Sequence, residues 1–123
     1  MYDKILVRQI LVQIEEALQK IANRSSRYAS ADDFIATQAG AETLDSICML
    51  FMAIGEALKN LDKITGGTLL SKYPGVDWKG AIGFRDIIAH QYVEGDAEQV
   101  FWICANEVAP LMAVIQEMIE EMD

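Results

Sequence analysis

The sequence predicts an all-α fold, an antiparallel bundle of four main helices in a single domain spanning residues 1–123. Apolar residues recur at helical spacing along almost the whole chain, and no segment alternates between apolar and polar residues as a strand does. No internal repeat or low-complexity segment divides the chain, whose length of 123 residues suits one domain. Stacked amphipathic helices bury such stripes against one another, which favours a bundle.

The first helix is predicted from about residue 3 to residue 26. Its apolar stripe comprises Ile10, Ile14, Leu18 and Ile21, with Leu6, Val7 and Leu11 beside them. Ser30, followed three residues later by Asp33, resembles an N-cap and predicts a short helical turn over 32–35.

A second long helix is predicted over 37–64, before the stop signal of Gly66 and Gly67. Gly40 and Gly55 lie inside it. A glycine in a helix interior costs about 1 kcal/mol relative to alanine, so each predicts a close helix–helix contact or a kink.

The second half of the chain predicts two more helices. Asp77 is suited to cap a helix over 78–91, and Asp96 with Gln99 forms a capping-box pattern that opens a helix to about residue 122. Pro110 lies inside this last helix and is expected to kink it near Asn106.

Composition favours a cytoplasmic homodimer. Apolar residues make up 52% of the chain, which suggests that a partner subunit covers some of them. No apolar run is long enough to span a membrane, and the N-terminus has no secretory pattern. Cys48 and Cys104 are isolated in apolar contexts and are interpreted as reduced core residues. The residue inventory offers no metal-binding set and no cofactor motif, so we expect neither a metal nor a cofactor.

The charge is strongly negative but unevenly distributed. A net charge of −9 argues against a general nucleic-acid binder, and no DNA partner is expected. Residues 59–85 nevertheless contain five basic residues against Asp62 and Asp77, whereas residues 94–123 contain eight acidic residues and no basic one. The interpretations that stay open are ordinary solvated helix faces, a small phosphate-attracting site on an acidic body, or an acidic face that awaits a basic partner.

The candidate site is the segment Arg85–Tyr92, which holds the one histidine of the chain. Histidine has an unperturbed pKa of about 6.5 and can both accept and donate a proton near neutrality. Arginine binds phosphate through a planar fork of donors. Proton-transfer chemistry at a phosphate is therefore the activity that this segment favours.

On an ideal helix, however, Arg85 and His90 do not converge, because five residues separate them by about 140°. Either the helix ends near His90, so that its side chain is free to turn, or two chains share the site. At a two-fold axis, two His90 and two Arg85 side chains would meet. One imidazole could then take the proton of a ribose 2′-OH while the other protonates the leaving 5′-oxygen, with the arginines stabilising the negative charge. This chemistry cleaves RNA without a metal and requires the 2′-OH.

Structural roles are the alternative for each group. His90 could be a helix cap, and Tyr92 a core aromatic residue with its hydroxyl at the rim. Arg85 could pair with Asp86, Asp77 or Glu56, and Asp86 could support the site by orienting Arg85 or a backbone group. Glu56, in an otherwise apolar run, is predicted to be a buried acid that needs a cation.

These residues also resemble a known family. The pattern of arginine, four residues, histidine, one residue and tyrosine is the RX4HXY motif of HepT-like proteins, members of the HEPN group (higher eukaryotes and prokaryotes nucleotide-binding). The resemblance extends over residues 54–61, over the segment 73–78 that leads into the motif helix, and over residues 100–102.

The resemblance implies an all-helical homodimer with a composite ribonuclease site, acting as the toxin of a prokaryotic toxin–antitoxin pair. Arg85 and His90 become catalytic, and Asp86 matches the polar residue that follows the motif arginine. The implied partner is a minimal nucleotidyltransferase antitoxin that silences the toxin by transferring AMP to Tyr92. The alternative is a non-catalytic HEPN-type module that binds nucleotides or serves as an adaptor for the nucleotidyltransferase. A third possibility is a purely structural helical dimer.

Overall fold

The computed structural model describes residues 2–94 and 96–122, apart from the side chains of residues 91–94. Helices account for all the regular structure in this part of the chain, which confirms the all-α prediction. The elements are α1 (Lys4–Ser25), α2 (Ala31–Ile35), α3 (Gln38–Ile64), the short 3-10 helix η1 (Leu70–Lys72), α4 (Trp78–Ile82), α5 (Phe84–Glu94), α6 (Ala97–Asn106) and α7 (Val108–Met122).

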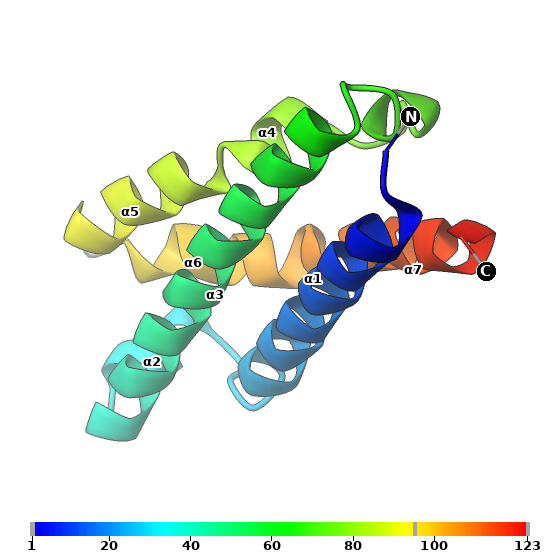
Figure 1. Ribbon diagram of the computed structural model, residues 1–123. Helices are drawn as coiled ribbons and strands as arrows, with labels where there is room; N and C mark the ends of the chain where they lie inside the picture. The colour runs from blue at the N-terminus through cyan, green and yellow to red at the C-terminus, as the bar shows by residue number, and fades with distance from the viewer. Residues whose placement is uncertain (1, 95, 123) are drawn as a thin grey trace.

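The two longest helices, α1 and α3, run antiparallel to each other (Figure 1). Helix α7 packs on α1, and α5 packs on α3, so that the short helices extend the central pair on either side. The fold therefore keeps four helical segments in the predicted places, although the regular four-helix bundle that we expected is not seen.

The core lies between these helices and is formed by the predicted apolar stripes. Its largest fully buried side chains are Leu11, Ile14, Leu18, Ile21, Phe34, Ile47, Phe51, Ile54, Leu58, Leu61, Ile88 and Ile115. Since Ile88 is among them, the candidate motif is carried by a helix whose inner face is anchored in the core.

The predicted helix over 78–91 is divided in two at Gly83, contrary to expectation. The Gly83 N–H closes α4 by donating to Lys79 O at 3.0 Å, and the Gly83 carbonyl accepts from Asp86 N and Ile87 N, both at 3.1 Å, to begin α5. Glycine weakens a helix interior, so the chain can change direction here at low cost. Arg85 consequently lies in the first turn of a new helix.

The last predicted helix is also interrupted, close to the expected position. Helix α6 ends at Asn106 and α7 begins at Val108, so Pro110 occupies the first turn of α7. Proline is tolerated there because the first N–H groups of a helix have no intrahelical acceptor. The interruption at Glu107 confirms the kink that Pro110 predicted.

Side-chain caps form at two of the three predicted positions. Asp77 accepts from Gly80 N at 3.0 Å, and Asp96 accepts from Gln99 N at 3.1 Å. Ser30 occupies the N-cap position of α2, as predicted, but its side chain forms no capping hydrogen bond. Asp33 instead accepts from Ala29 N at 3.0 Å, so the acid of the pair stabilises this turn.

The absence of a membrane-spanning segment and the formation of a homodimer were the two remaining expectations. Within the described ranges, no helix combines the length and the apolar character that crossing a bilayer requires. Several large apolar side chains are exposed, and the homodimer stays a prediction; these side chains are Ile5, Leu6, Ile35, Met49, Ile87 and Trp102.

Candidate active site

Gly55 on α3 positions the candidate site. A Cβ atom built at Gly55 would lie 3.0 Å from Ile82 O and 3.2 Å from Arg85 N, which is closer than ordinary side-chain packing allows. The junction of α4 and α5 therefore rests directly on the backbone of α3, as the helix-interior glycine predicted. This contact sets Arg85 beside the residue that follows Gly55.

That residue is Glu56, and it binds Arg85. The Arg85 Nη1 donates to Glu56 Oε2 at 2.5 Å, and this ion pair is one of the alternatives that the sequence left open. The side chains are 55% and 58% exposed, so the prediction of a buried Glu56 is wrong. Apolar neighbours in sequence did not imply burial, because Glu56 lies on the outer face of α3.

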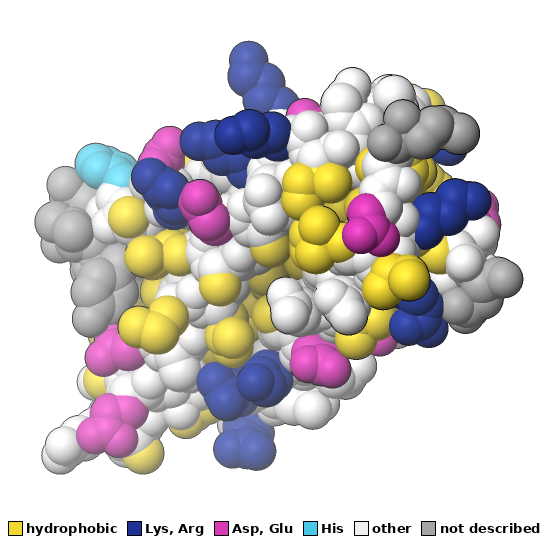
Figure 2. All heavy atoms as spheres, in the orientation of Figure 1, with side chains coloured by type: hydrophobic (Ala, Val, Ile, Leu, Met, Phe, Trp, Pro, Cys, Tyr) yellow, Lys and Arg dark blue, Asp and Glu magenta, His cyan; other side chains and the backbone are white. Residues whose placement is uncertain are grey.

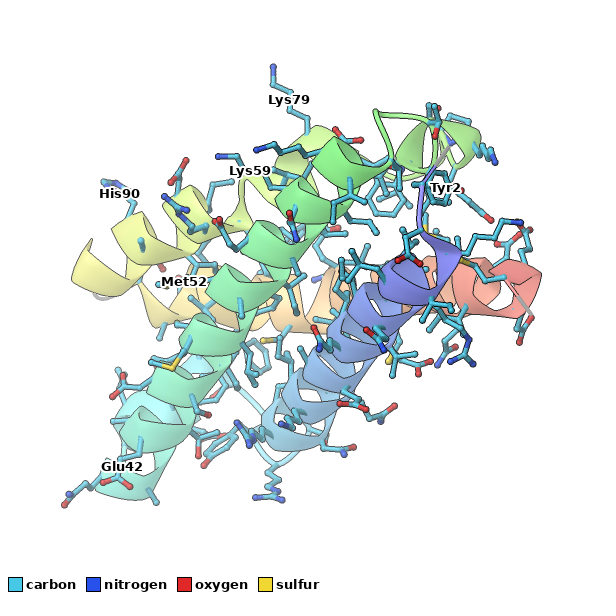
Figure 3. The ribbon with its side chains drawn as sticks, viewed as in Figure 1. Tyr2, Glu42, Met52, Lys59, Lys79 and His90 are labelled. Carbon is cyan, nitrogen blue, oxygen red and sulfur yellow. The ribbon has the colours of Figure 1, made fainter. Side chains whose placement is uncertain are left out.

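His90 also lies at the surface, on a different face of α5. Its side chain is exposed and projects away from the helical body (Figure 3). Helix α5 continues through Glu94, four residues beyond His90. The proposal that the helix ends near His90 and frees the side chain is therefore wrong, and the imidazole remains about 140° around the axis from Arg85.

The two other predicted site residues lie on the same helix. Asp86 is exposed in the first turn of α5, where a carboxylate is favoured by the helix dipole. Its side chain forms no hydrogen bond or ion pair with any described residue, so its supporting role stays a prediction. Tyr92 belongs to α5, but its side chain lies outside the described residues.

A cavity of about 330 Å³ borders α5 without including the Arg85 or His90 side chain. Phe84 and Ile87 face it from α5, and the 52% exposed Trp102 faces it from α6. Arg85 and His90 are not among its lining residues. The Arg85 and His90 side chains therefore stand on an open surface, which suits an extended substrate better than a small molecule that must be enclosed.

The cysteines do not contribute a nucleophile. Burial, with a further contribution from Asp45, raises the pKa of the Cys48 thiol to about 11. Burial and the neighbouring Cys48 raise the pKa of Cys104 to about 12. Both residues are free thiols, Cys48 buried and Cys104 half-buried. Protonated thiols are poor nucleophiles at neutral pH, so the core interpretation holds for Cys48 and, less completely, for Cys104.

Sequence reasoning missed two features of this site. One is the partner of Arg85: the sequence left Asp86, Asp77 and Glu56 open, and the structure forms the ion pair with Glu56. The other is the role of Gly55 in bringing the two residues together. The signal for the second was present, since Gly55 immediately precedes Glu56 inside a helix.

Comparisons with known proteins identify the family of the chain. The family model described as "Ribonuclease HepT-like" matches residues 8–118, which include the whole motif. A curated protein of Methanocaldococcus jannaschii, named "Putative RNase", is 29% identical over 117 residues, covering 95% of this chain and 90% of the relative. No solved structure gives a significant match. Since the family match extends from α1 to α7 and contains Arg85, His90 and their helix, the chain belongs to the HepT-like ribonuclease family.

Proposed function

We propose that the protein is a metal-independent endoribonuclease whose active site is completed by a second copy of the chain. The observation that supports it most directly is the unbroken course of α5 past His90. One chain offers one imidazole, on a face of the helix about 140° from Arg85. Symmetric pairing of two α5 helices supplies the second imidazole and a guanidinium across the interface.

The reaction is an intramolecular transesterification of RNA. One His90 imidazole removes the proton of the 2′-OH, and the 2′-oxygen forms a bond to the adjacent phosphorus. The bond from phosphorus to the 5′-oxygen breaks, and the second His90, as imidazolium, gives this oxygen its proton. The products are a 2′,3′-cyclic phosphate and a 5′-hydroxyl. Arg85 stabilises the additional negative charge on the phosphoryl oxygens.

The ion pair with Glu56 is compatible with this role for Arg85. Ion pairs that are half exposed contribute about 0–1 kcal/mol, because water competes for both charges. A phosphate can therefore displace the Glu56 carboxylate, and the guanidinium is already held at the start of α5 when the substrate arrives.

The composite site is tested by subunit mixing. His90→Ala should abolish cleavage of a single-stranded RNA in the presence of a chelator, and a 2′-deoxy residue at the cleaved position should protect the substrate. When wild type and His90→Ala are unfolded, mixed in equal amounts and refolded, activity should fall to about a quarter, because only dimers of two wild-type chains keep both imidazoles. A fall to about a half would show that each chain acts alone. Unchanged cleavage by His90→Ala would favour the non-catalytic module.

We further propose that the ribonuclease is a toxin, silenced by a nucleotidyltransferase antitoxin that transfers AMP to the Tyr92 hydroxyl. The support is the family assignment and the position of Tyr92, two residues after His90 on α5. AMP there would add bulk and negative charge beside a site that must bind phosphate, and so would exclude RNA. Co-expression with such an enzyme should add the mass of one AMP per chain. An adduct that persists in Tyr92→Phe would contradict the assignment.

A further inference from the structure

Three exposed lysines lie next to the contact between Arg85 and Glu56. Lys59 and Lys63 follow Glu56 by three and seven residues on α3, so all three side chains share one face of that helix. Lys79 is exposed on α4, which packs against α3 and leads through Gly83 into the motif helix. We call Lys59, Lys63 and Lys79 the lysine track.

The lysine track has no charged partner among the described residues. Among the residues that the structure describes, none of the three forms an ion pair or a hydrogen bond. Asp77 caps α4 through Gly80 N. Asp62 follows Lys59 by three residues on α3 and lines the same cavity as Lys79, but among the described residues it forms no ion pair with either lysine. Lysines without an ion pair, on a protein of net charge −9, leave their ammonium groups available to an anionic partner.

The figures place the lysine track beside the motif. Lys and Arg atoms lie among Asp and Glu atoms along the upper edge of the molecule, with the histidine at the left end of this edge, and other Lys and Arg atoms lie at the bottom and on the right (Figure 2). Lys59, Lys79 and His90 project on the same side of the molecule from α3, α4 and α5 (Figure 3). A strand that lies in the active site can therefore continue along these lysines.

The far end of the lysine track opens on a surface cavity of about 430 Å³. Trp78, Lys79 and Ser71 line it together with Asp62 and Gly67. The indole of Trp78 is held in place, because its Nε1 donates to Tyr73 O at 2.8 Å. An aromatic ring with an adjacent lysine offers a stacking surface for a nucleobase and a counter-charge for its phosphate.

We propose that the lysine track binds the phosphates of single-stranded RNA on one side of the cleaved bond, and that the cavity at Trp78 holds one base of that strand. The inference rests on the proposed ribonuclease function and specifies how its substrate is held. Flexible single strands suit this surface because they can present phosphates to the lysines and a base to the cavity at once. A flat anionic membrane would contact the lysines but leave the cavity unused.

Salt-dependent binding tests the lysine track without requiring cleavage. The ligand is a fluorescent single-stranded RNA in which every 2′-OH is methylated, so that it cannot be cut. In anisotropy titrations from low to moderate salt, each lysine that contacts a phosphate contributes about 0.7 to the slope of log K against log salt. Lys59→Gln/Lys63→Gln should lower the slope by about 1.4 and Lys79→Gln by about 0.7, each with weaker affinity at low salt.

The matched controls carry the same change of charge elsewhere. Lys4→Gln/Lys20→Gln alters α1 and should leave the slope at the wild-type value. Equal loss of slope in this control, or a wild-type slope in the track variants, would overturn the inference. Binding of the wild type to phosphatidylglycerol vesicles but not to the RNA would also overturn it.

Trp78 fluorescence tests the base-binding cavity. Trp102→Phe leaves Trp78 as the one tryptophan, and saturating RNA should then quench its emission. Saturated binding without quenching would refute the cavity. Failure of the ribonuclease proposal is distinguishable, because it appears as intact unmodified RNA in the presence of wild-type protein, whatever the binding slopes show.

Discussion

At the scale of single residues, the partner of Arg85 determines how available its charge is. Glu56 holds the guanidinium by an exposed ion pair, so it competes with any phosphate that approaches. The sequence showed which residue types could meet but could not choose between Asp77, Asp86 and Glu56, because that choice depends on where the turn at Gly83 directs α5.

We predict that Glu56→Gln increases the apparent affinity for RNA. The amide removes the competing negative charge, so KM for RNA cleavage should fall several-fold, whereas the free energy of unfolding should change by less than about 1 kcal/mol. Glu42→Gln removes a charge from the distant first turns of α3 and serves as the control. An unchanged KM in Glu56→Gln would show that Glu56 does not compete with RNA phosphates for Arg85.

The cysteines supply a second prediction at this scale. Their raised pKa values, about 11 for Cys48 and about 12 for Cys104, keep both thiols protonated near neutral pH. We expect an aromatic disulfide reagent to label the native protein slowly at about pH 8 and to label the denatured protein at once. Rapid labelling of native Cys104 would contradict the raised pKa.

At the scale of elements, the sequence predicted the helices well and the breaks unevenly. Pro110 predicted the interruption near Asn106, because proline lacks a backbone N–H and its ring clashes with the preceding turn of a helix. Gly83 gave a weaker signal, since a glycine is tolerated inside many helices and only the contact with α3 makes the chain turn there. Capping hydrogen bonds were equally hard to predict. Ser30 and Asp96 have similar sequence contexts, but only the Asp96 side chain accepts a hydrogen bond from a backbone N–H, that of Gln99.

This difference predicts unequal effects of two alanine substitutions. Asp96→Ala should lower the free energy of unfolding by about 1 kcal/mol, because Gln99 N loses its acceptor. Ser30→Ala should have little effect, since no capping hydrogen bond is lost. Chemical denaturation of both variants measures the two values, and equal losses would contradict the cap assignment.

The glycine contact between helices predicts a coupled loss of stability and activity. In Gly55→Ala, the new methyl group would press on Ile82 O and Arg85 N, so the junction of α4 and α5 must move. We expect a loss of about 1–3 kcal/mol in stability. RNA cleavage by the folded fraction should also fall, because Arg85 is displaced. Gly75→Ala, where a Cβ meets nothing within 4 Å, is the control and should be close to neutral.

At the scale of the whole molecule, the two cysteine thiols and Tyr73 should lower the free energy of unfolding as the pH becomes alkaline. The Tyr73 hydroxyl donates to Glu121 Oε2, and burial followed by this bond raises its pKa to about 12. When folding raises the pKa of a group, that group stabilises the folded protein fully below its unfolded-state pKa. This contribution is lost as the pH rises through the folded-state pKa.

We therefore expect the free energy of unfolding to decline above the ordinary cysteine pKa of 9.0 and to keep falling toward the folded-state values of about 11 and 12. Denaturation curves at about pH 8, 9 and 10 measure the decline. Replacing both cysteines with alanine should flatten it. A decline of equal steepness in that variant would assign the effect to other groups.

Charge is arranged unevenly over the whole molecule, and this affects how a polyanion approaches it. Exposed carboxylates of Glu117, Glu120 and Glu121 occupy α7, at the opposite end of the molecule from α5 (Figure 1). Their field repels nucleic acid from α7, whereas the lysines of α3 and α4 attract it. Encounters are thereby oriented before contact is made, so raising the ionic strength should slow association more than it speeds dissociation.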